Sequence, residues 1–186
     1  MAFRKPKPSD ELRGKIMLVV GLTGVGTEVS RRAHAFGMQV GAIDARELER
    51  PKFIFSLDKP AKLMERLAEA DVVVLACPLT NETRGLMGND QFRAMKKAAY
   101  FVNVESDDLV NRPALEEALQ NQTIAGAGLG GINHRNPSVA NLVINPHVDR
   151  PSPAGQDRQW RLFRENIRRF VAGEALLEVV DKSNGF

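Results

Sequence analysis

Short apolar runs that alternate with helical patterns constrain the fold of this chain more than any other feature of its sequence. Apolar runs predict strands over residues 15–22, 39–45, 71–77, 99–104, 124–131 and 141–148. Helical patterns lie over residues 26–37, 60–70, 88–98, 111–122 and 156–172. Runs that are apolar on both faces and separated by helices indicate parallel strands joined by right-handed crossovers. The sequence therefore predicts an α/β fold with a doubly wound parallel sheet.

The length of 186 residues is enough for one sizeable core and hardly enough for two full domains. We expect a basic N-terminal tail over residues 1–10, the α/β domain over 11–155, and a C-terminal helix and tail over 156–186. No apolar run approaches the roughly 20 residues that a membrane span needs. The single cysteine, Cys77, excludes an internal disulfide and fits a reducing cytoplasm.

The net charge of +3 and the isoelectric point near 9.2 make the chain mildly basic. Lys and Arg are scattered, except for a group at roughly helical spacing that comprises Arg158, Arg161, Arg164, Arg168 and Arg169. No interleaved aromatic residues or nucleic-acid motif accompany this group. A solvated helix face is therefore favoured over a nucleic-acid surface.

A glycine-rich loop separates the first predicted strand from the first predicted helix. In "VVGLTGVGTEV" the glycines are Gly21, Gly24 and Gly26, and Asp44 ends the next predicted strand. This order is typical of a dinucleotide site, in which the loop and the helix N-terminus hold the pyrophosphate and the acid binds the ribose hydroxyls. Asp44 would favour NAD over NADP, because its charge would repel a 2′-phosphate.

Thr23 departs from the usual glycine spacing of such a loop. Counting from Gly21, it occupies the position of the second glycine, which normally lets the backbone approach the pyrophosphate closely. Its branched side chain would obstruct that approach, although its hydroxyl is able to hydrogen-bond a phosphate. The sequence favours dinucleotide binding and leaves open a fold that has lost it.

The run "ADVVVLACPLTNETRGLMG" (70–88) carries a specific resemblance, together with the glycine loop and "NLVINPHV". Over residues 11–181 the chain resembles the NAD-binding domain of the D-isomer-specific 2-hydroxyacid dehydrogenases. The resemblance implies a Rossmann-like fold and NAD as the cofactor. The residues expected to contact the cofactor are Gly21, Thr23, Gly24, Val25, Gly26, Asp44, Pro78 and Thr83.

The catalytic positions of this family are only partly matched. Its members use an Arg to bind the substrate carboxylate, a His to exchange a proton with the substrate oxygen, and a Glu to hold that His. His147, in "NPHV", matches the histidine and is expected to be a remnant general acid/base. Ser106, in "NVESDDLV", occupies the arginine position, and counting without gaps puts Arg135 at the glutamate position.

These substitutions leave functions from different classes open. A module that binds NAD and works through interactions is favoured, because the substrate-binding Arg and its partner Glu are replaced. The alternative is an NAD-dependent oxidoreductase that a partner subunit or dimer completes, or that acts on a non-acidic substrate. A relic that only folds is the third possibility. Family members also carry a substrate domain ahead of the NAD domain, so a truncated member is expected.

Three carboxylates follow the predicted strand 99–104, namely those of Glu105, Asp107 and Asp108. They are potential oxygen ligands for a metal ion. Carboxylates at this spacing before a helix are more typical of helix caps and of partners for the helix dipole, which is the interpretation we favour. They would also oppose an anionic substrate, since two charges about 4 Å apart interact by roughly 4 kcal/mol at an effective dielectric constant of about 20.

The last predicted helix has one apolar face, formed by Trp160, Phe163, Ile167 and Phe170 at spacings of three to four residues. In the family this helix normally packs against the substrate domain. Here the face needs another partner, which is the chain's own sheet, a second copy or a different protein. We expect a homodimer or a partner protein to bind it, because exposed apolar faces usually mark interfaces.

Overall fold

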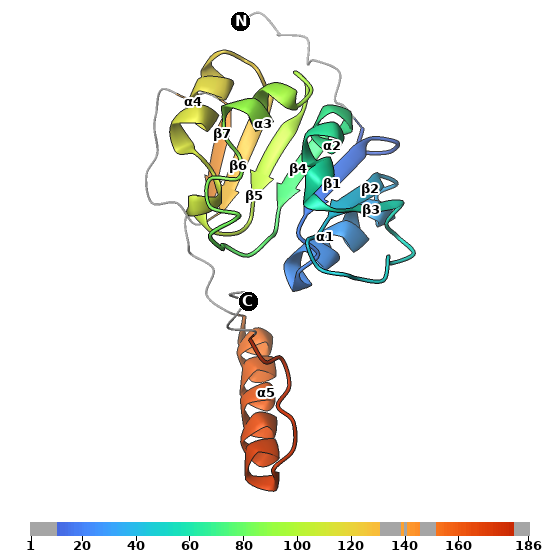
Figure 1. Cartoon of the computed structure of the whole chain (residues 1–186), viewed down its shortest axis with the longest axis vertical. Helices are drawn as coiled ribbons and strands as arrows, with labels where there is room; N and C mark the ends of the chain where they lie inside the picture. Colours follow the sequence, from blue (N-terminus) through green and yellow to red (C-terminus); the bar gives the residue numbers. More distant parts are fainter. Residues whose placement is uncertain (1–10, 131–138, 140, 146–151, 181–186) are drawn as a thin grey trace, which may run out of the picture.

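The computed structural model describes residues 11–130, 139, 141–145 and 152–180. Within them, seven strands form one sheet in the order β3-β2-β1-β4-β5-β6-β7 (Figure 1). The strands are β1 (Ile16–Val20), β2 (Gln39–Ile43), β3 (Ser56–Asp58), β4 (Val72–Leu75), β5 (Tyr100–Asn103), β6 (Gly126–Gly130) and β7 (Leu142–Asn145). Every neighbouring pair is parallel, which confirms the predicted doubly wound α/β fold.

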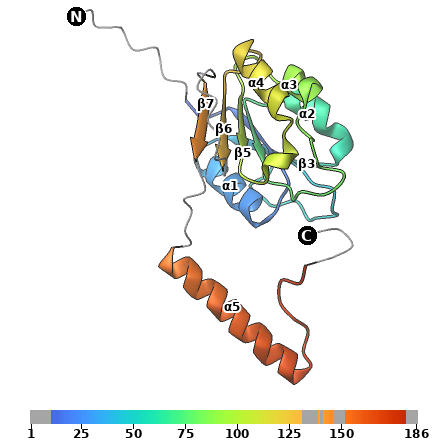
Figure 2. The same cartoon turned by 90° about the vertical axis from the view of Figure 1, so that its left-hand side faces the viewer.

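Helices cover both faces of this sheet. They are α1 (Gly24–Ala35), α2 (Leu63–Glu69), α3 (Asn89–Ala94) and α4 (Arg112–Gln120). The other helical segments are α5 (Pro153–Ala172), which does not cover the sheet, and the 3-10 turns η1 (Pro60–Lys62) and η2 (Asp107–Leu109). Helices α2, α3 and α4 lie on one side of the sheet and α1 on the other (Figure 2). No described helix is long and apolar enough to cross a membrane.

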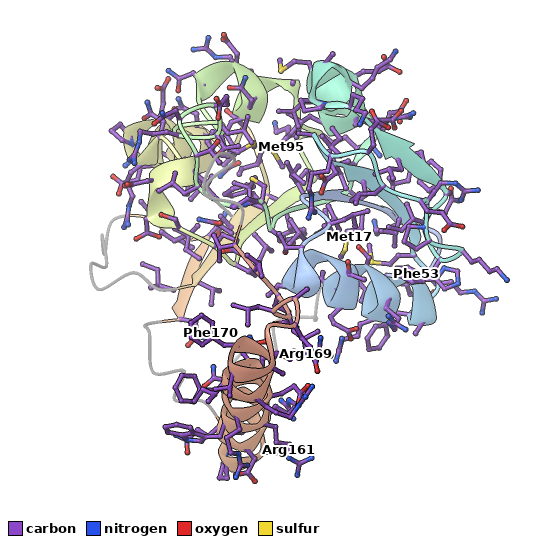
Figure 3. The ribbon with its side chains drawn as sticks, turned by 60° about the horizontal axis from the view of Figure 1, so that its bottom comes forward. Met17, Phe53, Met95, Arg161, Arg169 and Phe170 are labelled. Carbon is purple, nitrogen blue, oxygen red and sulfur yellow. The ribbon has the colours of Figure 1, made fainter. Side chains whose placement is uncertain are left out.

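Successive side chains of the central strands enter two separate cores, as the period of a strand requires. On β1, Leu18 belongs to the core under α2–α4, and Val19 belongs to the core under α1. Met17 lies on the α1 side and Met95 on the opposite side (Figure 3). The central strands are therefore apolar on both faces, which is why their runs were recognisable in the sequence.

Three details differ from the sequence predictions. Strand β3 was not predicted, because it has only three residues, all half-buried, and lacks an apolar run. The predicted helix over 60–70 begins as the 3-10 turn η1 before α2. Helix α5 begins at Pro153 rather than at residue 156, because the Ser152 side chain accepts a hydrogen bond from the N–H of Gly155.

The α1 face of the sheet is covered unevenly within the described residues. Helix α1 packs against β1 and β2. Val102 on β5 and Val143 on β7 are both paired with Gly128 on β6, so their side chains lie on the same face of the sheet. Val102 packs against the α1 core, which identifies this face. Val143 nevertheless has 71% of its surface exposed, and Tyr100 and Val104 are exposed as well. The β5–β7 half of this face, defined here by Tyr100, Val104 and Val143, is therefore an open apolar surface.

Helix α5 stands away from the sheet (Figures 1 and 2). The segment after it returns along the helix, where the side chain of Asn166 exchanges two hydrogen bonds with the backbone of Leu177. Arg168 pairs with both Glu165 and Glu174. These contacts leave the predicted apolar face exposed, and its members are Trp160, Phe163, Ile167 and Phe170.

The core under α2–α4 yields a test of this packing. Phe101 is fully buried and meets Phe92 edge to face, with ring centroids 5.3 Å apart. We predict that Phe101→Ala lowers the free energy of unfolding by about 3–5 kcal/mol. Phe36→Ala is the control, because Phe36 is 67% exposed and its loss should change that energy by less than about 0.5 kcal/mol. Urea denaturation measures both, and equal effects would contradict the assigned core.

Candidate cofactor site

The glycine loop joins β1 to α1 at the carboxyl edge of the sheet. Gly21 has a φ of +98°, and a Cβ on it would lie 2.5 Å from the backbone of Cys77. A Cβ on Gly26 would lie 2.0 Å from the Gly21 carbonyl oxygen. Both positions therefore require glycine, and together they bring the start of α1 against the end of β1. A Cβ on Gly24 would meet nothing within 4 Å, so the space in front of the helix is open.

Thr23 caps α1 rather than reaching outward. Its Oγ1 accepts a hydrogen bond from the N–H of Gly26 at 3.2 Å and donates one to the carbonyl of Ala76 at 2.9 Å. The hydroxyl proton of Thr23 is therefore donated within the protein. The structure does not show the hydroxyl placed to donate to a phosphate, as the sequence suggested. Thr23 instead fastens the loop to the end of β4.

The start of α1 offers the groups that hold an anion. The first N–H groups of a helix have no acceptor within the helix, and the helix dipole adds a partial positive charge there. In α1 these include the N–H groups of Gly24 and Val25, next to the capped Gly26. No acidic residue lies in this first turn. The loop is therefore suited to a pyrophosphate, and its residues fit a dinucleotide.

Asp44 lies at the end of β2, where the sequence placed it, but it is buried and already bound. Its carboxylate accepts hydrogen bonds from the N–H of Leu22 at 2.8 Å and from the guanidinium of Arg46. Burial acts to raise the pKa of this carboxyl, and the hydrogen bonds from Arg46 and Leu22 outweigh burial and lower it. The Asp44–Arg46 pair was not predicted, although an Arg two residues after the acid was a visible signal.

A cavity of about 510 Å³ opens beside the loop. Its lining comprises Val20, Gly21, Ile43, Asp44, Ala45, Arg46, Pro60, Leu63, Cys77, Pro78, Thr80, Glu82, Thr83 and Leu86. Of the residues expected to contact the cofactor, Gly21, Asp44, Pro78 and Thr83 line this cavity, and Thr23, Gly24, Val25 and Gly26 are not among its lining. The Thr83 hydroxyl donates to the Pro78 carbonyl at 2.8 Å and shapes this wall. Burial raises the pKa of the Cys77 thiol to about 11, so this wall carries no thiolate at neutral pH.

The acidic segment after β5 is organised by its polar neighbours. Ser106 caps the turn η2 by accepting a hydrogen bond from the N–H of Asp108, and Asp108 pairs with Arg84. The capping part of the prediction for these carboxylates was wrong, because Ser106 caps η2 and Asn111 caps α4. Asp107 and Asp108 do lie in the first turn of η2.

Glu105 follows the carboxyl end of β5, two residues after its last residue, Asn103. Burial raises the pKa of its carboxyl, and its backbone N–H donates to the side chain of the buried Asn103. Its charge also contributes to raising the pKa of Cys77, which lines the cavity. No group of three or more His, Cys, Asp or Glu side chains in the described part of the chain is arranged to hold a metal ion.

The catalytic positions inferred from the resemblance divide into two groups. Ser106, at the family's arginine position, lies in the described segment that follows β5. His147 and Arg135 lie outside the described residues. Of the residues predicted for the site, the structure therefore describes the expected cofactor contacts and Ser106.

The glycine loop can be tested by a matched pair of substitutions. We predict that Gly26→Ala lowers the melting temperature by several degrees, because the new methyl group would collide with the Gly21 carbonyl. Gly24→Ala should leave the melting temperature unchanged or raise it slightly, since its Cβ has open space. Thermal unfolding without cofactor measures both, and a stable Gly26→Ala variant would contradict the close approach.

Comparison with known proteins agrees with this geometry. The curated relatives include the glycerate dehydrogenase of Methylorubrum extorquens, which is 30% identical over 176 residues, covering 90% of this chain and 53% of the relative. The glyoxylate reductase of Korarchaeum cryptofilum is 33% identical over 173 residues, covering 88% of this chain and 51% of the relative. The chain thus spans about half the length of the curated relatives it matches.

Solved structures show the same architecture. A D-isomer specific 2-hydroxyacid dehydrogenase from Xanthobacter autotrophicus, in complex with NADPH and MES, superposes with a TM-score of 0.84 at 27% identity, over 99% of this chain and 77% of that chain. A second one, from Lactobacillus delbrueckii in its NAD complex, gives a TM-score of 0.78 at 27% identity, over 97% and 61%.

The family model described as "D-isomer specific 2-hydroxyacid dehydrogenase, NAD binding domain" matches residues 2–149. This match confirms the resemblance inferred from the sequence and the assignment of a nicotinamide dinucleotide as the cofactor. The chain belongs to the D-isomer-specific 2-hydroxyacid dehydrogenase family, as a member that contains its NAD-binding domain.

Proposed function

We propose that this chain is a dinucleotide-binding module that does not reduce 2-oxoacids by itself. The observation that carries the proposal is the contrast between the carboxyl ends of β1 and β5, two strands that β4 separates in the sheet. The loop after β1 retains the close glycine packing and the open helix N-terminus of a cofactor site. The segment after β5 has Ser106 at the position of the family's substrate-binding Arg.

The charges in the segment after β5 argue against a site there that binds a substrate carboxylate. The Ser106 hydroxyl is engaged in capping η2, and Glu105 stands beside it near the cavity. Arg84, a cation close to this segment, already pairs with Asp108. A substrate carboxylate about 4 Å from a second carboxylate would meet a repulsion of roughly 4 kcal/mol at an effective dielectric constant of about 20. Binding of a 2-oxoacid would therefore be opposed where relatives attract it.

The alternative function is that of an oxidoreductase completed by a partner subunit or a dimer. It is favoured by the curated relatives, which include a glycerate dehydrogenase and glyoxylate reductases, and by the fact that this chain spans only about half their length. In this alternative a second polypeptide supplies the cation that Ser106 cannot provide. The acidic segment would equally suit a substrate without a negative charge.

Titration with NADH separates these functions. We predict that NADH binds at micromolar concentration, as measured by nicotinamide fluorescence. We also predict that no NADH is oxidised when glyoxylate or hydroxypyruvate is added. Val25→Asp should weaken binding about tenfold or more, because it puts a negative charge beside the pyrophosphate at the exposed start of α1. Val25→Thr is the control of nearly equal size and should retain binding. Oxidation of NADH by the isolated chain in the presence of a 2-oxoacid would contradict the proposed binding module.

We also propose that the apolar face of α5 binds a second copy of this chain. That face is exposed, and the open β5–β7 surface of the sheet is an apolar partner of suitable kind. Phe170 projects from one side of α5, whereas Arg161 and Arg169 project from the other, so the helix has one apolar and one charged side (Figure 3). Because each copy carries both surfaces, two copies can exchange α5 helices symmetrically.

Mass measurement by size-exclusion chromatography with light scattering tests this interface. We predict a dimer of the 20.5 kDa chain, and monomers for both Phe163→Asp on the helix face and Val143→Asp on the sheet face. Arg161→Asp is the control on the charged side of α5 and should leave the dimer intact. A parent chain that stays monomeric at about 100 µM, a concentration at which a dimer with a micromolar dissociation constant would form, would contradict the proposal.

A further inference from the structure

The carboxyl ends of β4 and β5 lie side by side in the sheet. Leu75 on β4 pairs with Asn103 on β5, and the N–H of Val104 donates to the Leu75 carbonyl at 3.2 Å. Cys77 and Glu105 each lie two residues beyond the Leu75–Asn103 pair. Burial raises the pKa of the Cys77 thiol, and the charge of Glu105 adds to this rise, as expected for neighbours. Strand register and charge together place Glu105 beside Cys77, which lines the cavity.

The carboxylate of Glu105 has no partner of opposite charge among the residues that the structure describes. It accepts no hydrogen bond and forms no ion pair with any of them. Asp108, in the same segment, differs in being paired with Arg84. Burial raises the pKa of Glu105, because a carboxylate withdrawn from water without a partner favours its neutral form. A positive group of a ligand would offset this cost.

The backbone that carries Glu105 is held by the side chain of Asn103. The Oδ1 of Asn103 accepts a hydrogen bond from the N–H of Glu105 at 3.1 Å, and its Nδ2 donates to the carbonyl of Ser106 at 3.0 Å. Asn103 is fully buried, so both contacts are shielded from water. A charged side chain on a fixed backbone loses less conformational entropy when it meets a ligand.

The topology of the sheet assigns the two halves of a dinucleotide to different strands. In a doubly wound sheet the ligand lies across the crevice where the strand order reverses, and each mononucleotide is held by one half of the sheet. Here the order reverses between β1 and β4. The glycine loop and Asp44 belong to the β1–β3 half, which takes the adenosine side. The β4–β6 half, which includes the segment with Glu105, is left for the nicotinamide side.

The charge of a nicotinamide ring depends on its oxidation state. The ring is a pyridinium cation in NAD⁺ and a neutral dihydropyridine in NADH, and the rest of the two molecules is the same. A carboxylate near the ring attracts only the cation, whereas it repels the pyrophosphate of both forms alike. The ratio of the two affinities therefore isolates the interaction of that carboxylate with the ring.

We propose that Glu105 makes this site favour the oxidised dinucleotide, NAD⁺, over NADH. The inference rests on the proposed dinucleotide binding and deepens it, because it names the redox form that the module retains. Glu105 is then a specificity-determining residue that acts through its charge. The competing role for Glu105 is a structural one, in which its side chain only shapes the segment after β5.

Calorimetric titration of the full chain with NAD⁺ and NADH tests the inference, with Glu105→Gln as the variant. Measurement at about pH 8 lies well above the ordinary pKa of a Glu carboxyl, roughly 4.3. We expect the parent chain to bind NAD⁺ more tightly than NADH. Glu105→Gln should lower the ratio of the NAD⁺ affinity to the NADH affinity about tenfold, because it removes the charge and keeps the size of the side chain.

Two controls accompany this titration. ADP-ribose lacks the nicotinamide, so Glu105→Gln should change its affinity in the same way as that of NADH. Glu117→Gln makes the same substitution at an exposed position of α4 that does not line the cavity, and it should leave the affinity ratio unchanged. The melting temperature of Glu105→Gln should match that of the parent chain, which shows that the variant is folded.

The outcomes are distinguishable. If Glu105→Gln weakens NAD⁺, NADH and ADP-ribose equally, Glu105 is structural and the inference is wrong. If the variant keeps the affinity ratio of the parent chain, or if the parent chain binds NADH more tightly than NAD⁺, the inference fails and the proposed function stands. If the parent chain binds none of the three ligands, the proposed function fails and the inference fails with it.

Discussion

The contact between the start of α1 and the end of β1 is the constraint on which the rest of the site depends. Two glycines permit it, since a side chain on Gly26 would collide with the carbonyl of Gly21. Because all strands are parallel, their carboxyl ends share one edge of the sheet. The close contact holds the start of α1 at that edge, and Gly21 of the same loop lines the cavity. Thr23 preserves this geometry by capping the helix and binding the Ala76 carbonyl.

The two halves of the edge differ in their charge balance. At β1 and β2, the negative charge of Asp44 is offset by Arg46, and the helix dipole adds positive potential. At β5, Ser106 stands where the resemblance predicts the family's substrate-binding Arg, and Glu105 contributes an acid whose pKa burial raises. An anionic cofactor and an anionic substrate would therefore meet opposite environments within one fold. This contrast connects family membership with the proposal of a module that binds without reducing 2-oxoacids.

Much of the fold could be predicted because the central strands are buried on both faces and leave short, continuous apolar runs in the sequence. Strand β3 could not be predicted, since its three half-buried residues are not distinguishable from a loop in the sequence. The loop glycines and Asp44 were recognisable by position. The roles of Thr23 and Arg46 were not, because they depend on contacts with Ala76 and Leu22 that no local pattern specifies. The roles assigned to His147 and Arg135 stay predictions from the resemblance.

The most direct test of the central claim is an NMR titration of the amide-labelled chain with NADH. The claim is that the dinucleotide binds at the start of α1 and along the cavity beside it. It predicts the largest amide shifts at Gly24 and Val25, smaller ones at Thr83, and none at Phe170 on α5. Unchanged amides at Gly24 and Val25 at saturating NADH would contradict it.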